Sequence, residues 1–121
     1  MLAYKVMGAG VNGFAVEAIC LDVASGLTAT GTTQADAYSL TAATNAFTTV
    51  ASGTGAVLSS DATGGDSQLV YNGGANALKV YPPSGQKMNA LATDAAMTLA
   101  VNTACDFRKL TSTVWTGILS A

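Results

Sequence analysis

The residues of this chain that could carry out acid–base or nucleophilic chemistry are few and widely spaced. The chain has no histidine, so neither a Ser-His-Asp triad nor a Cys-His pair can form. Glycoside hydrolysis needs two carboxylates that face each other across a cleft. The acidic residues are instead dispersed, mostly beside turn residues that carboxylates commonly stabilise; they are Glu17, Asp22, Asp36, Asp61, Asp66, Asp94 and Asp106. The sequence therefore predicts no catalytic residues and no enzyme activity.

Two short motifs have the form of ligand sites, and both are weak. Asp61 and Asp66 bracket Ala-Thr-Gly-Gly, and a loop with two carboxylates and free carbonyls can hold Ca²⁺. No further acidic residue lies nearby, so an ordinary loop is the favoured interpretation. Residues 8–13 match the G-x-G-x-x-G pattern, but the strand–helix alternation of a dinucleotide-binding fold is missing. We therefore expect no metal and no cofactor.

The two cysteines, Cys20 and Cys105, lie far apart in the sequence. Without a C-x-x-C pair or a histidine they cannot form a zinc site. A disulfide between them would connect the N-terminal segment to a late strand. Buried free thiols are the favoured state, because cysteine packs as a small hydrophobic residue.

The composition predicts a neutral, hydrogen-bonding surface. Charged residues make up 10% of the 121 positions, against about 25% in an average soluble domain. Thr, Ser, Asn and Gly must form most of the surface, with little charge repulsion between copies. Such a surface suits a subunit that packs against others. The net charge is −2 and the five basic residues are scattered, which argues against binding to nucleic acid or to an anionic membrane.

Short runs of β-type residues between turn residues predict the elements that position these side chains. The clearest runs are 68–72 and 77–81, which we expect to form a hairpin because the Asn-Gly-Gly-Ala-Asn between them tolerates positive φ. Further strands are expected at 27–30, 37–40, 46–50, 56–58, 88–91, 96–101, 105–110 and 114–119. Strands at intervals of roughly 8–12 residues indicate a sandwich or barrel. The sequence thus predicts an all-β fold, as an antiparallel β-sandwich. For residues 90–101 an alanine-rich helix is the alternative.

Residues 1–25 differ from the rest and are predicted to form an N-terminal arm, with residues 26–121 as the body. Within the arm, residues 2–6 alternate like one face of a strand. Residues 14–23 fit both helical and strand spacing, and we favour a strand.

Five apolar side chains are candidates for contact with a partner. They are Leu2, Tyr4, Val6, Phe14 and Trp115. Exposed together, the four in the arm would form an interaction patch. The alternative for these four is a first strand that closes the sheet. For Trp115 the alternative is core packing with its indole N–H satisfied.

Four segments in order carry a resemblance to a known kind of protein. They are Gly26-Leu-Thr-Ala-Thr-Gly-Thr-Thr-Gln34, Thr49-Val-Ala-Ser-Gly-Thr-Gly-Ala-Val-Leu58, Tyr71-Asn-Gly-Gly-Ala-Asn-Ala-Leu-Lys-Val-Tyr-Pro-Pro-Ser-Gly85 and Asn89-Ala-Leu91. Their order resembles small virion proteins of tailed bacteriophages, above all those that decorate or cement the capsid shell. It is also similar to β-modules of phage fibres. The resemblance covers residues 26–115 and leaves the arm unassigned.

The resemblance implies a β-sandwich, often jelly-roll-like, that works as a homo-oligomer, commonly a trimer. It implies no catalytic residues. The expected partner is the major capsid protein, and the expected location is the outer capsid surface of the virion. Apart from the resemblance, we hypothesise that the arm reaches a neighbouring subunit by strand addition. The alternative function is a fibre or host-recognition β-module that binds through the loop 59–66 and the turn 72–76.

Overall fold

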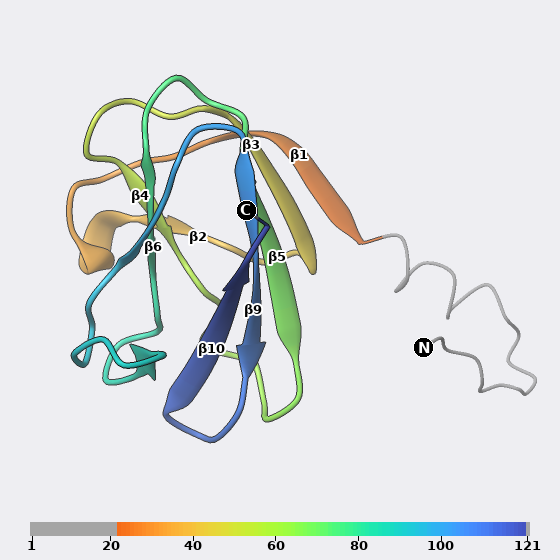
Figure 1. Cartoon of the computed structure of the whole chain (residues 1–121), viewed down its shortest axis with the longest axis vertical. Helices are drawn as coiled ribbons and strands as arrows, with labels where there is room; N and C mark the ends of the chain where they lie inside the picture. The colour runs from red at the N-terminus through yellow and green to blue at the C-terminus, as the bar shows by residue number, and fades with distance from the viewer. Residues whose placement is uncertain (1–21, 121) are drawn as a thin grey trace, which may run out of the picture.

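The computed structural model describes residues 22–120, and its regular elements are strands apart from one short 3₁₀ turn (Figure 1). The strands are β1 (Val23–Thr28), β2 (Tyr38–Ser39), β3 (Thr44–Thr49), β4 (Gly55–Val57), β5 (Ser67–Asn72), β6 (Leu78–Tyr81), β7 (Lys87–Met88), β8 (Met97–Leu99), β9 (Thr103–Lys109) and β10 (Val114–Leu119), and the 3₁₀ turn is η1 (Gln34–Asp36). The prediction of an all-β fold is confirmed. The alternative helix at 90–101 is replaced by turns and β8. Within the described range, no helix is long and apolar enough to cross a membrane.

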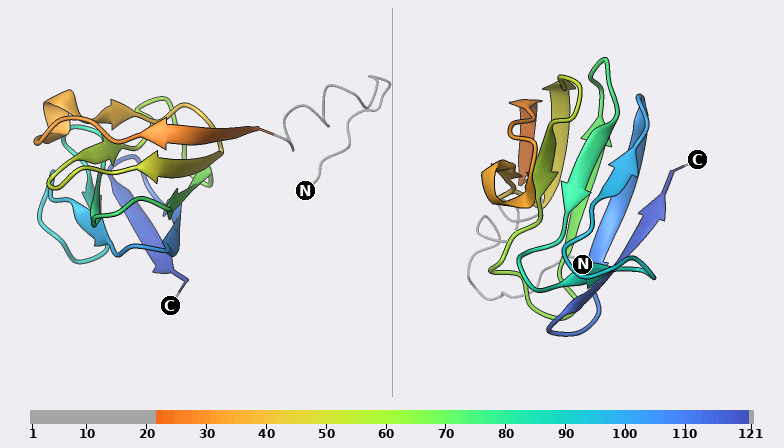
Figure 2. Two further views of the ribbon diagram at one scale, coloured as in Figure 1. Left: turned by 90° about the horizontal axis from the view of Figure 1, so that it is seen from above. Right: turned by 90° about the vertical axis from the view of Figure 1, so that its left-hand side faces the viewer.

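The strands form two mixed sheets between which the chain alternates. Sheet A has the order β1-β3-β5-β9-β10-β7, and sheet B has the order β2-β4-β6-β8. From β1 to β9 each strand joins the opposite sheet from the strand before it, so the chain winds like a solenoid (Figure 2). As a result β1, β3 and β5 are parallel, and so are β2, β4 and β6. The antiparallel pairs arise where β8, β9 and β10 run back.

The predicted antiparallel sandwich and its jelly-roll form are therefore wrong, although the strand positions agree closely. The predicted hairpin is also wrong, because β5 lies in sheet A and β6 in sheet B. Alternation of apolar residues determines which face of a strand is buried, but it does not determine the strand's partner. The boundary expected after residue 25 falls inside β1, and most of the predicted arm lies outside the described residues.

The connection between β5 and β6 is a corner between the sheets, and Asn72 stabilises it. The Asn72 side chain is fully buried. Its Nδ2 donates to the carbonyls of Asn76 at 2.9 Å and Leu99 at 3.0 Å, and its Oδ1 accepts from the amide of Gly74 at 3.0 Å. A Cβ at Gly74 would lie 2.7 Å from the Cβ of Val50, so the corner leaves no room for a side chain there. The segment 72–76, which suggested a hairpin turn, therefore forms a tight connection from sheet A to sheet B.

The core lies between the two sheets and is formed by inward-facing side chains of both. Trp115, Phe47 and Phe107 are the largest fully buried side chains. The Tyr38 ring meets the Phe47 ring edge-on, with centroids 5.8 Å apart. Lys109 also points inward, where its Nζ donates to the carbonyl of Ala62 at 2.8 Å and lies 5.8 Å from the centre of the Trp115 ring.

Cys105 is a buried thiol of strand β9, and it has no disulfide partner among residues 22–120. Burial raises the pKa of the Cys105 thiol to about 11, and the negative charge of Asp106 adds to the effect. The thiol therefore stays protonated and unreactive near neutral pH. Cys20 lies outside the described residues, so the Cys20–Cys105 disulfide stays untested.

Four acidic residues accept backbone hydrogen bonds in turns or corners, namely Asp22, Asp36, Asp66 and Asp94, whereas Asp106 lies within strand β9. Asp36 Oδ1 accepts hydrogen bonds from the amides of Thr33 at 2.8 Å and Thr32 at 3.0 Å. The hydrogen bond from the Thr33 backbone amide is the main cause that lowers the pKa of Asp36, and the hydrogen bond from the Thr33 hydroxyl lowers it further. Asp94 accepts from the amide of Gly85 at 2.7 Å, and Asp22 from an amide in the corner before β3 at 3.0 Å.

Candidate functional site

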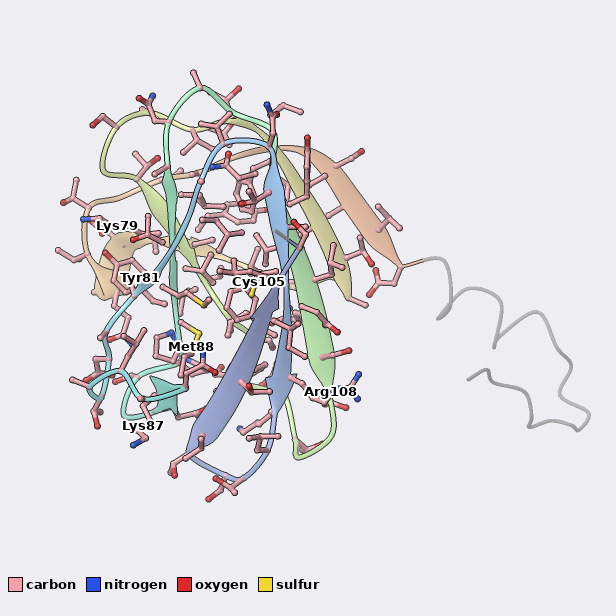
Figure 3. The ribbon with its side chains drawn as sticks, in the orientation of Figure 1. Lys79, Tyr81, Lys87, Met88, Cys105 and Arg108 are labelled. Atoms are coloured by element: carbon pink, nitrogen blue, oxygen red, sulfur yellow. The ribbon has the colours of Figure 1, made fainter. Side chains whose placement is uncertain are left out.

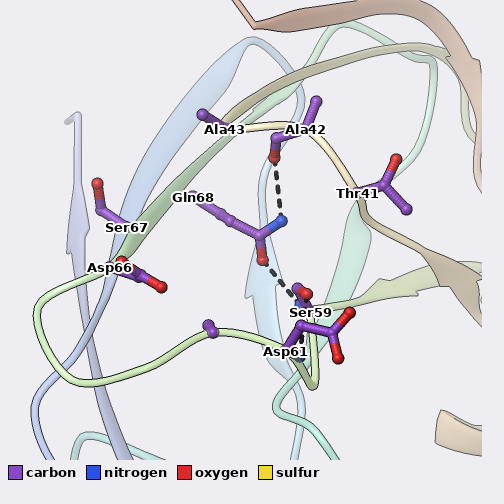
Figure 4. Close-up of a pocket in the computed structure, with 9 residues that line it drawn as sticks. Thr41, Ala42, Ala43, Ser59, Asp61, Asp66, Ser67 and Gln68 are labelled. Atoms are coloured by element: carbon purple, nitrogen blue, oxygen red, sulfur yellow. Dashed lines mark hydrogen bonds between the residues drawn. The ribbon is translucent and has the colours of Figure 1, made fainter. Parts of the chain in front are cut away.

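A shallow groove follows the corners where the chain passes from sheet B to sheet A. One hollow of about 300 Å³ lies between the corners after β2 and β4 (Figure 4). A second hollow of about 250 Å³ extends to Pro83 and Ser84 in the corner after β6. The hollows share Thr41, Ser59 and Asp61, so they form one continuous depression, here called the corner groove.

Gln68 fixes the floor of the corner groove. It occupies an inward position of β5 and is only 5% exposed. Its Oε1 accepts from the amide of Ser59 at 2.8 Å, and its Nε2 donates to the carbonyl of Ala42 at 3.0 Å (Figure 4). One amide thus joins two successive corners of the winding chain. Sequence reasoning missed this role because Gln68 looked like an ordinary first residue of a strand.

The two carboxylates of the corner groove belong to the loop considered above for Ca²⁺. Asp66 Oδ2 accepts from the amide of Thr63 at 2.9 Å and from its hydroxyl at 3.3 Å, which is ordinary turn chemistry. Across residues 22–120, no three acidic, cysteine or histidine side chains gather as a metal site would require. Hydroxyl, amide and carboxylate groups in the groove can bind a polar ligand by hydrogen bonds.

The outward face of sheet A forms a second candidate surface, here called the outer face. Inward residues such as Phe107 alternate along each strand with outward ones. The strand register aligns five outward residues from β1 to β10 in one row: Val23, Thr44, Leu69, Asp106 and Ile118. Neighbouring rows contain Ala46, Tyr71 and Ala104 on one side, and Ser67, Arg108 and Thr116 on the other.

No element within residues 22–120 covers the outer face (Figure 2). Three of its apolar side chains are well exposed, namely Ile118 at 62%, Val23 at 59% and Tyr71 at 38%. Sheet B differs, because its outward Tyr81 is only 9% exposed and its hydroxyl lies 3.4 Å from the carbonyl of Thr32. A sheet face that carries exposed apolar side chains among polar ones is suited to contact with another protein.

The structure corrects the candidate interface predicted from the sequence. Leu2, Tyr4, Val6 and Phe14 lie outside the described residues. Trp115 is fully buried, and its Nε1 donates to Gln86 Oε1 at 2.7 Å. The interface role expected for Trp115 is therefore wrong, because the folded chain exposes none of this side chain.

The outward residues of β5 and β10 were missed as candidates. Alternation in Gln-Leu-Val-Tyr of β5 already indicates that Leu69 and Tyr71 share one face. Which face of β5 is buried in the core and which lies on the outer face could not be recognised without the pairing of the strands. Tyr71 of β5 and Tyr81 of β6, which belong to the two strands of the expected hairpin, lie on different sheets.

Comparisons with protein-family models, with curated proteins and with solved structures found no match to this chain.

Proposed function

We propose that this chain is a structural virion protein of a tailed bacteriophage, a decoration or cement protein that binds the assembled capsid shell through the major capsid protein. The resemblance of residues 26–115 and the low charge of the surface support this proposal. The observation that carries it is the outer face, a sheet surface of mixed apolar and polar side chains that residues 22–120 leave uncovered. A surface of this kind is suited to assembly with other subunits.

The arm supplies the contact with the shell in this proposal. β1 is an edge strand of sheet A, and the arm precedes it in the sequence. The arm, through Leu2, Tyr4, Val6 and Phe14, adds a strand to a neighbouring subunit. A protein that binds the assembled lattice and not loose subunits stabilises the lattice by mass action. Many bridging copies strengthen the effect, because each bound contact raises the effective concentration of the next.

The copy number in purified virions tests the proposed function. Quantitative mass spectrometry should give a ratio to the major capsid protein near one, or a simple fraction of it. Such a ratio follows because a decoration protein occupies lattice positions. A ratio of a few per cent would instead place the protein in the tail or fibres, and its absence from virions would overturn the proposal.

Deleting residues 1–13 should weaken binding to capsid shells while the body stays folded. These residues include the alternating side chains of Leu2, Tyr4 and Val6 and lie outside the described fold. Co-sedimentation with shells that lack this protein measures binding, and urea unfolding of the same variant measures the body. A full-length variant with Leu2, Tyr4 and Val6 replaced by serine keeps the length and separates side-chain contacts from backbone pairing. Normal binding of the deletion variant would refute the role of the arm.

A fibre or host-recognition module is the second candidate, because the corner groove offers a place for a polar ligand such as a glycan. Its rim has hydroxyls of Thr41, Ser59 and Ser84 beside the carboxylate of Asp61. None of the residues that line the groove is aromatic, whereas sugar rings commonly stack on aromatic side chains. The same copy-number ratio separates the two functions.

A further inference from the structure

We propose that the outer face packs against the outer face of a second copy. The two-fold axis lies between the facing A sheets of the two copies, parallel to both sheets and perpendicular to β9 at the level of Phe107. This inference rests on the proposed function in one respect, namely that the protein acts as an assembly subunit. It specifies the partner of the sheet face that residues 22–120 leave uncovered. The contact is isologous, so it predicts a dimer where the resemblance led us to expect a trimer.

The charges of the outer face support this symmetry. Asp106 and Arg108 both point outward from β9, and the inward Phe107 lies between them. Figure 3 shows Arg108 extending away from the interior, in which Cys105 and Met88 lie. Within residues 22–120 no ion pair engages either charge. The acid and the base therefore remain available to a partner.

The spacing along β9 makes this pair of charges self-complementary. Residues i and i+2 of a strand lie about 7 Å apart on one face. Rotation about the proposed axis reverses the direction of β9, so Asp106 of each copy faces Arg108 of the other. Two ion pairs form, and no like charges meet. Any face-to-face arrangement that placed Asp106 over Asp106 would be repelled.

Apolar side chains flank the two ion pairs in this arrangement. Leu69 and Ile118 are the register neighbours of Asp106 on β5 and β10. They lie where the aliphatic stem of the partner's Arg108 would cross the face, and such stems pack well on apolar surface. Ser67 and Thr116, the register neighbours of Arg108, are small enough to let the two faces approach.

Charge reversal at the two positions tests the contact in the full-length chain. Sedimentation of the wild-type protein should show a dimer. Asp106→Arg places two arginines opposite two others, and Arg108→Asp places aspartates opposite aspartates. Each variant alone should therefore associate at least about tenfold more weakly. An equimolar mixture of the two variants should restore a heterodimer, because every arginine then faces an aspartate.

The mixture also serves as the folding control, because a variant that failed to fold could not restore association. The double variant Asp106→Arg/Arg108→Asp should dimerise by itself, as the exchange keeps both pairs. A monomeric or trimeric wild type, or a mixture that stays dissociated, would overturn the proposed contact. These results are independent of the virion measurement. A dimer absent from virions contradicts only the proposed function, and a monomer present at lattice stoichiometry contradicts only this contact.

Discussion

Replacing Asn72 with alanine should lower the free energy of unfolding by roughly 3 kcal/mol or more, because the change leaves up to three backbone groups without a partner at about 1–3 kcal/mol each. The side chain is fully buried and joins the corner residues Gly74 and Asn76 to Leu99 of β8. Its loss also leaves a cavity between the sheets. Urea unfolding followed by far-UV circular dichroism measures the change.

Two further variants make the Asn72 result specific. Asn72→Asp has nearly the same shape, but it loses both donors and places an acid at a buried position, so it should destabilise the fold strongly as well. Thr98→Ala changes an exposed side chain of β8 and should shift the free energy by less than about 0.5 kcal/mol. Equal stabilities of Asn72→Ala and Thr98→Ala would show that the corner does not depend on the Asn72 side chain.

Replacing Trp115 with alanine should cost about 3–5 kcal/mol, the usual range for removing a large aromatic side chain from a core. Trp115 is fully buried, and the carboxamide of Gln86 and the ammonium of Lys109 contact its indole ring. Removal of the ring would therefore leave a cavity, an unpaired carboxamide and a buried cation that has lost one of its neighbours. Urea unfolding again gives the free energy.

Trp115→Phe is the matched control for this change. It keeps most of the buried ring but loses the N–H donor to Gln86, so its cost should be clearly smaller than that of the alanine variant. The pair also distinguishes the core role from the interface role predicted from the sequence. If Trp115→Ala unfolded like the wild type but lost its association with other subunits, the core assignment would be wrong.

The positions of the strands were accessible from the sequence because they depend on local patterns. The predicted runs at 68–72 and 77–81 coincide with β5 and β6 within one residue at either end. Turn residues and prolines end strands for reasons of backbone geometry that act within a few residues. The same holds for Asp36, Asp66 and Asp94, whose places beside turn residues indicated that their carboxylates would accept backbone hydrogen bonds.

The pairing of the strands was not accessible in this way. The sequence between β5 and β6 satisfies the requirements of a hairpin turn, and it satisfies equally those of a corner between two sheets. The choice depends on Val50 and Leu99, which are distant in sequence and meet Gly74 and Asn72 only in the folded chain. Long-range contacts of this kind leave no local signal.

The sequence by itself determined that this chain is all-β, weakly charged and without histidine, and it determined which side chains of each strand share a face. Only the tertiary structure decided that the strands alternate between two mixed sheets, that Trp115 is buried, and that Asp106, Arg108 and Ile118 lie together on the outer face, which residues 22–120 leave uncovered. The physical reason is that alternation along a strand is a property of its own backbone. The partner of each strand, and therefore what lies beside a given side chain, depends on how distant segments pack and satisfy their hydrogen bonds.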